Sequence, residues 1–137
     1  MMNELISYND SLILRELGFD EACFAWYSNG QLILEHHIIF TGDQYYMRKE
    51  DCNAPTFSQA FRFFREKFNL FSCVELHLNF PIRYYFRIEE IGNDDFVYHT
   101  EDETIFYDKY EDAEIACLKL LIKIIKIENQ YERLCSL

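Results

Sequence analysis

Cysteine and histidine are the residues of this chain best suited to binding a metal. The sequence has five cysteines and four histidines. A structural zinc site needs four such ligands, usually in closely spaced pairs. No two cysteines have that spacing, and the adjacent His36 and His37 would point to opposite faces of a strand. We therefore expect no metal and no other cofactor, and we interpret the cysteines as small core residues.

Catalytic nucleophiles and phosphate-binding loops also leave recognisable patterns. The sequence has no GxSxG elbow, no cysteine-protease signature and no glycine-rich phosphate loop, and it contains only four glycines. A non-enzymatic binding or interaction module is therefore the leading expectation. The alternative is a small enzyme whose site is assembled only by the tertiary fold.

Carboxylates are concentrated in one stretch that is able to attract a basic partner. Residues 89–114 contain eleven acidic side chains and one basic side chain, in a chain of net charge −11. The regular oxygen spacing and the glycine of a calcium loop are missing. Solvated turns are one interpretation, and a ridge that binds a basic protein, including a nucleic-acid-mimic inhibitor, is the other. The ridge would consist of Asp94, Asp95, Glu101, Asp102 and Glu103.

A second candidate surface is the polar face of a predicted β-hairpin. Apolar and polar residues alternate over 74–79 and again over 82–89, which is typical of two half-buried strands. Arginine and tyrosine are enriched at protein interfaces, and an ordinary solvated sheet face is the alternative. The candidate partner-binding residues on this face are His77, Arg83, Tyr85 and Arg87.

The register of this hairpin follows from matching its two apolar faces. Opposed residue numbers must have an even sum, because an odd sum would place polar residues against apolar ones. A three-residue loop over 80–82 then predicts that Glu75 faces Arg87 and that His77 faces Tyr85.

The elements that must position these residues are predicted from caps, breakers and periodicity. Asn9 or Asp10 is expected to cap the first helix, and Gly18 to end it in a left-handed conformation. Ser28-Asn29-Gly30 is a strong hairpin turn signal. Residues 41–55 are interpreted as a loop. The predicted short elements are a helix over 11–17 and strands over 23–27, 31–40, 96–99 and 104–107.

A second helix is expected to begin at Thr56, with Gln59 as its capping-box partner. Phe63 lies outside the apolar stripe of this helix, so it is expected to be partly exposed. The stripe itself consists of Phe57, Ala60, Phe61, Phe64 and Phe68.

The last predicted helix, Tyr110–Asn129, is apolar over most of its circumference. Asp108 is expected to cap it, with Glu111 as the box partner. Four of its charged residues lie within about a sixth of the circumference, and nearly every other residue over 113–127 is apolar. The four are Asp112, Lys119, Lys123 and Lys126. We therefore expect contacts on two sides, made within the chain or, alternatively, with a second copy, so the protein is expected to be a monomer or a homodimer through this helix.

Composition and charge exclude several classes of partner. Phosphate backbones and anionic membranes require clustered basic residues, so neither nucleic acid nor membrane is expected. No apolar run approaches the roughly 18 residues of a membrane span. The N-terminal residues show no signal-peptide pattern, so a cytoplasmic location with reduced thiols is predicted. A protein partner, basic in character, remains the expected class.

Two stretches resemble small uncharacterised proteins encoded by bacterial phages and mobile elements. They are AFRFFREKF, at residues 60–68, and YEDAEIACLKLLIKI, at residues 110–124, and residues 16–25 add to the resemblance. Most of the matching positions are aliphatic, aromatic or capping residues. The resemblance therefore implies an accessory or host-interaction protein and implies no catalytic residue.

These observations predict one domain over residues 1–137 with an α+β fold. The expected architecture is an antiparallel sheet of about four to six strands with one face covered by three helices. The expected order is helix, two strands, helix, two strands, up to two further strands and the long helix.

Overall fold

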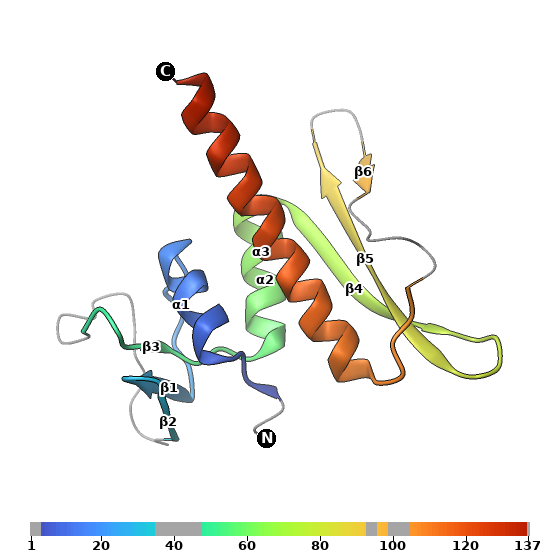
Figure 1. Ribbon diagram of the computed structural model, residues 1–137, viewed down its shortest axis with the longest axis horizontal. Helices are drawn as coiled ribbons and strands as arrows, with labels where there is room; N and C mark the ends of the chain where they lie inside the picture. Colours follow the sequence, from blue (N-terminus) through green and yellow to red (C-terminus); the bar gives the residue numbers. More distant parts are fainter. Residues whose placement is uncertain (1–3, 35–47, 93–95, 99–104, 137) are drawn as a thin grey trace. The chain divides into compact units, whose positions relative to one another are not determined.

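The computed structural model describes residues 4–34, 48–92, 96–98 and 105–136 (Figure 1). Its helices and antiparallel strands confirm the α+β class. The chain divides into two compact units, residues 1–60 and 61–137, which we call the first and second units. Among the described residues the strands form two separate three-stranded sheets, instead of the one sheet expected. The single domain inferred from the chain length stays a prediction.

Both units contain a helix and an antiparallel sheet. Helix α2 (Phe57–Phe68) crosses the division between them. The first unit contains α1 (Tyr8–Glu16), β1 (Ala25–Ser28), β2 (Gln31–Leu34) and β3 (Cys52–Asn53). The second unit contains β4 (Leu70–His77), β5 (Arg83–Ile91), β6 (Phe96–Tyr98) and α3 (Tyr110–Cys135).

The β1–β2 hairpin of the first unit forms where its turn residues predict. Ser28 pairs with Gln31. Asn29 and Gly30, the two residues that connect this pair, have φ angles of 49° and 83°, respectively. Two consecutive positive φ angles are typical of the type I′ turn, whose twist matches that of the flanking strands. The predicted second strand is described only as far as Leu34, and residues 35–40 lie outside the described residues.

Helix α1 begins three residues before its predicted start. The Ser7 side chain accepts a hydrogen bond from the Asp10 backbone N–H at 3.4 Å, so Ser7 is the N-cap in place of Asn9 or Asp10. Serine is as effective a cap as either residue. Gly18 has the predicted left-handed conformation, with φ at 101°.

Strand β3 lies inside the segment interpreted as a loop. It pairs with β1, so Tyr27 lies opposite Cys52. One buried cluster of this unit consists of Ala25, Tyr27, Cys52 and Ala54, and the Tyr27 hydroxyl donates a 2.6 Å hydrogen bond to the Ile6 carbonyl. A two-residue strand is too short to show an alternating pattern, which is why the sequence did not reveal it.

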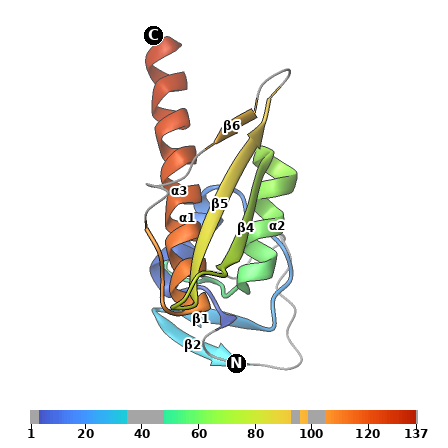
Figure 2. The same ribbon diagram turned by 90° about the vertical axis from the view of Figure 1, so that its right-hand side faces the viewer.

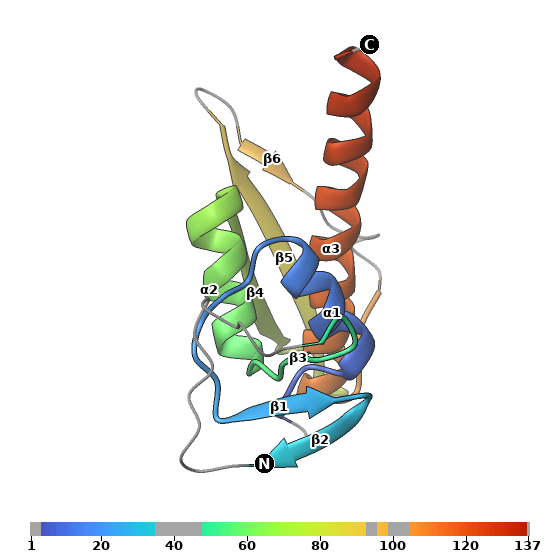
Figure 3. The ribbon, with the colours of Figure 1, turned by 90° about the vertical axis from the view of Figure 1, so that its left-hand side faces the viewer.

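The second unit has the sheet order β4-β5-β6, with all its strands antiparallel. Helix α3 packs on β4 and β5. Figures 2 and 3, taken from opposite sides, show that α3 and residues 61–68 of α2 lie on the same face of this sheet. The apolar side chains of Leu70, Phe86 and Ile88 are buried on that face.

The numbers of opposed residues in β4 and β5 have an even sum, as predicted. Each residue of β4, however, lies opposite a residue of β5 two positions away from the predicted one. Glu75 faces Tyr85 and His77 faces Arg83. The difference is due to the length of the loop. Strand β4 ends at His77 and β5 begins at Arg83, so five residues connect them instead of three. Each side chain keeps its predicted face, because a shift of two residues preserves the alternation.

Helix α2 has its predicted capping box. The Gln59 N–H donates to the Thr56 hydroxyl at 3.2 Å, and the Thr56 N–H donates to the Gln59 side chain at 3.0 Å. The expected partial exposure of Phe63 is wrong, because Phe63 is buried and Phe61 is only half-buried. The Phe63 ring makes edge-on contacts with the rings of Phe64 and Phe68, and these contacts shield it from solvent.

Helix α3 is longer than expected and begins without the expected cap. It ends at Cys135 instead of Asn129, and its N-cap is Lys109, which makes no side-chain capping bond. Instead, the negative charges of Glu111 and Asp112 in the first turn interact favourably with the helix dipole. Dimerisation through this helix stays a prediction. Its buried residues spread over half the circumference: Ala113, Cys117, Leu118, Leu121, Ile122, Ile124 and Ile125.

Candidate functional site

The sheet of the second unit has a face that points away from α2 and α3, which we call the outer face. Odd-numbered residues of β4 and β5 lie opposite one another on this face, as the register requires. The sequence-predicted candidates of the hairpin are brought together here. They are His77, Arg83, Tyr85 and Arg87.

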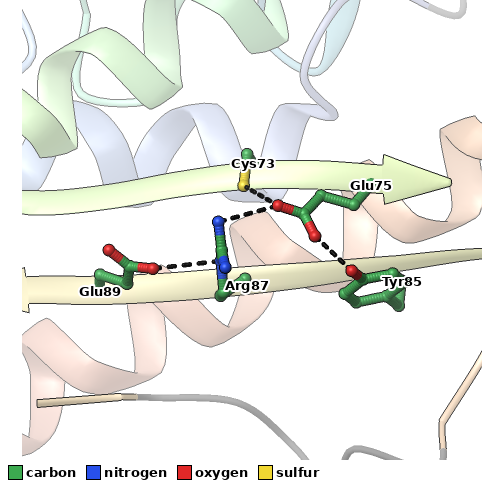
Figure 4. Close-up of polar contacts among 5 residues, drawn as sticks. All are labelled: Cys73, Glu75, Tyr85, Arg87 and Glu89. Carbon is green, nitrogen blue, oxygen red and sulfur yellow. Dashed lines mark hydrogen bonds and ion pairs between the residues drawn. The ribbon is translucent and has the colours of Figure 1, made fainter. Parts of the chain in front are cut away.

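A network of charged and polar side chains occupies the middle of the outer face (Figure 4). One carboxylate oxygen of Glu75 accepts a hydrogen bond from the Tyr85 hydroxyl, and the other lies 2.9 Å from an Arg87 nitrogen. Arg87 also contacts Glu89, at 3.1 Å. The predicted Glu75–Arg87 ion pair therefore forms, although the two residues are diagonal neighbours and not directly opposed.

This network shifts the pKa values of Glu75 and Tyr85 away from their ordinary values. The hydrogen bond from Tyr85, assisted by the charge of Arg87, holds the pKa of Glu75 below its ordinary value, and the same hydrogen bond raises the pKa of Tyr85. Glu75 is therefore ionised and Tyr85 is neutral at pH 7. Neither group has a pKa near neutrality, as a general acid or base would need.

We predict that Tyr85→Phe raises the pKa of Glu75 toward its ordinary value of 4.5, because the hydrogen bond that stabilises the carboxylate is lost. In the wild type, the stabilisation from Glu75 is present above pH 4.5 and disappears as the pH falls through the lowered pKa. An NMR titration of the Glu75 carboxyl carbon measures both proteins. Identical titration curves would contradict the assigned cause.

A cluster of rings that meet edge-on, which we call the aromatic cluster, lies beside this network, toward the β4–β5 loop. The Phe106 ring is 4.5 Å from the His77 ring and 6.3 Å from the Tyr85 ring, and the Arg83 guanidinium lies 4.7 Å above it. Buried atoms His77 Nδ1 and Arg83 Nε have no hydrogen-bond partner within the described part of the chain. These side chains form a cationic and aromatic surface.

Phe106 is a site residue that sequence reasoning missed. The neighbouring Tyr107 exchanges two 2.7 Å backbone hydrogen bonds with Tyr84, and this pairing fixes Phe106 on the outer face. A strand was expected over 104–107, and the available signal was that successive residues of a strand point to opposite faces, so that Phe106 would lie on the face opposite Ile105 and Tyr107. Its partner strand was not predictable.

The loop between β4 and β5, residues 78–82, exposes large apolar side chains, and we call it the hairpin tip. Phe80 is 95% exposed, Leu78 is 82% exposed and Ile82 is 59% exposed. Figure 1 shows the loop at the end of the β4–β5 hairpin. His77 and Arg83 flank it directly, so the tip and the aromatic cluster form one continuous surface.

The cysteines do not provide a nucleophile at this site. Burial, followed by the neighbouring Glu75, raises the pKa of Cys73, the cysteine on the outer face. Burial raises the pKa values of Cys23 and Cys117 to about 12 and that of Cys52 to about 11. These thiols are protonated at pH 7, whereas the thiolate is the reactive form. In the described ranges, no group of three or more His, Cys, Asp or Glu residues is placed to hold a metal ion.

The acidic candidates are not part of the described surface. Asp94, Asp95, Glu101, Asp102 and Glu103 lie outside the described residues. The acidic ridge therefore stays a prediction.

Comparison with protein-family models, with curated proteins and with solved structures finds no match. Of the helices in the described residues, none has the length and apolar character needed to cross a membrane.

Proposed function

We propose that this protein is a non-enzymatic protein-interaction module that binds its partner through the hairpin tip and the adjoining aromatic cluster. The observation that supports this proposal most strongly is the exposure of the tip, in which the Phe80 side chain is 95% exposed. Interfaces combine buried aromatic or aliphatic anchors with a polar rim in which tyrosine and arginine are enriched. The tip supplies the anchors, and Arg83 and Tyr85 supply the rim.

The chemistry of the surface indicates the kind of partner. An exposed loop of aromatic and aliphatic residues fits an apolar concavity on another protein, where the anchors lose their contact with water. The positive charge of the Arg83 guanidinium favours carbonyl or carboxylate oxygens at the edge of that concavity.

The biological setting is proposed from the sequence. Its resemblance to phage and mobile-element proteins supports an accessory role in contact with a host protein. The five cysteines are free thiols, which is typical of the cytoplasm. Capture of the partner from host lysate, by the wild-type chain and by Phe80→Ser in parallel, tests the proposed function. Equal capture of the same protein by both would contradict it.

The acidic stretch supports a separate binding surface for a basic protein, including one that normally binds nucleic acid. Reversing the charges of Asp94, Asp95, Glu101, Asp102 and Glu103 should abolish capture of such a partner, because the steering attraction is lost. Capture at low and high salt measures this effect, since surface electrostatics weaken with ionic strength. Equal capture by the reversed variant at low salt would show that the stretch only aids solubility.

A further inference from the structure

The last turns of α3 carry a stripe of large apolar side chains that the fold leaves uncovered. Ile127 is 55% exposed, Tyr131 is 69% exposed and Leu134 is 70% exposed, and we call these three residues the α3 stripe. The buried residues of α3 end at Ile125, and all residues over 129–136 are exposed. The described part of the chain therefore does not cover this end of the helix.

The spacing of the α3 stripe is that of a coiled-coil seam. Ile127, Tyr131 and Leu134 are four and three residues apart, which is the spacing of heptad positions d, a and d. The same spacing continues toward the start of the helix through Ile124 and Leu120. Ile124 is buried and Leu120 is half-buried in the fold of the chain itself. A partner helix therefore has access to the seam from Ile127 onward.

The residues that flank the seam carry opposite charges on its two sides. In this heptad Lys123 occupies a g position and Glu128 an e position, whereas the flanking residues Gln130 and Cys135 are uncharged. In a parallel pair of helices each g residue faces the next e residue of the partner, so Lys123 would face Glu128 of a second copy, twice by symmetry. In an antiparallel pair e faces e, and the register that sets Ile127 against Tyr131 would bring two Glu128 carboxylates together.

We propose that the end of α3 pairs with the end of α3 of a second copy in a parallel coiled coil that begins at Ile127. Ile127, Tyr131 and Leu134 of both copies form its apolar layers, which removes the α3 stripe from water. The two Lys123–Glu128 contacts border the first layer. The charge pattern thus favours a second copy as the partner and a parallel orientation.

This dimer would carry its two hairpin tips at one end. The ring of Tyr110, at the start of α3, lies 5.8 Å from the ring of Tyr84, near the start of β5. Figures 1 and 2 likewise show the β4–β5 loop and the start of α3 at the same end of the second unit. A dimer with both tips at one end binds a partner that offers two concavities more tightly, without any new contact. The dimer itself does not rest on the proposed function.

The middle residue of the stripe allows the contact to be removed without a change in the core. Tyr131→Glu places two charges in the central layer, so we expect the dissociation constant of the dimer to rise more than tenfold. Asn129→Glu adds the same charge at an exposed f position, which faces away from the second helix, so it should leave the dimer unchanged. Circular dichroism and thermal melting verify that both variants keep the fold.

An exchange of charges tests the parallel orientation. Lys123→Glu sets acidic flanks against each other, so we expect dimer affinity to fall by about two- to tenfold. The double variant Lys123→Glu/Glu128→Lys again has opposite charges at the two positions and should recover the affinity. Recovery requires that residue 123 of one copy faces residue 128 of the other, as the parallel arrangement provides.

Sedimentation equilibrium up to about 200 µM measures the dimer, since an interface of this size is near the lower limit for specific association. The proposal predicts a monomer–dimer equilibrium that Tyr131→Glu abolishes and that the double charge variant recovers. A monomer at every concentration would overturn it, and so would a dimer that survives Tyr131→Glu or a double variant as weak as Lys123→Glu. Partner capture through the hairpin tip is measured separately, so a failure of the proposed function is distinguished from a failure of the dimer.

Discussion

Replacement of Phe80 by serine is expected to abolish partner capture while the free chain keeps its stability. Truncation of a central aromatic anchor typically costs at least about 2 kcal/mol of binding free energy, which weakens binding roughly 30-fold or more. The folded monomer loses almost nothing, because the Phe80 side chain is already in water. Quantitative capture and thermal melting of the same preparations measure the two effects.

Phe24 provides a matched control for this variant. It is also a strongly exposed phenylalanine, at 79%, but it belongs to the first unit. Phe24→Ser removes the same side chain from another surface, so capture should equal that of the wild type. If both variants lose the partner equally, general loss of exposed apolar area is the cause, and the hairpin tip has no special role.

Truncation of Phe64 to alanine is expected to have the largest effect on stability. The side chain is completely buried, and its ring packs against those of Phe63 and Phe68. A cavity of this size costs about 3–5 kcal/mol, which is a large part of the roughly 5–15 kcal/mol that stabilises a domain. Urea denaturation followed by circular dichroism measures the loss.

Phe61→Ala in the same helix is the corresponding control. Phe61 is half-buried, so its truncation should cost clearly less than that of Phe64. Equal losses in free energy of unfolding would contradict the core assignment, because the two positions differ in burial and share the same residue type and helix.

Local chemistry made several elements predictable. The Thr56–Gln59 capping box and the Asn29-Gly30 turn are formed by neighbouring residues, so no distant contact was needed to infer them. The alternation in β4 and β5 correctly assigned Arg83, Tyr85 and Arg87 to one face.

Features that depend on distant residues were not predictable in the same way. Phe106 joins the site because Tyr107 pairs with Tyr84, more than twenty residues away in the sequence. The β4–β5 register depends on the length of the loop between the strands. The alternation of apolar and polar residues determines only that the numbers of two opposed residues have an even sum. The exposure of the hairpin tip was also missed, because Leu78 and Ile82 were interpreted as ends of the apolar strand faces.

Hydrogen exchange of the chain, alone and bound to its captured partner, tests the central claim most directly. Amides that become buried or ordered at an interface exchange more slowly. The proposed function predicts new protection at residues 77–85 and around Phe106, with the first unit unchanged. Protection confined to residues 1–60, with the hairpin tip exchanging as fast as in the free chain, would contradict it.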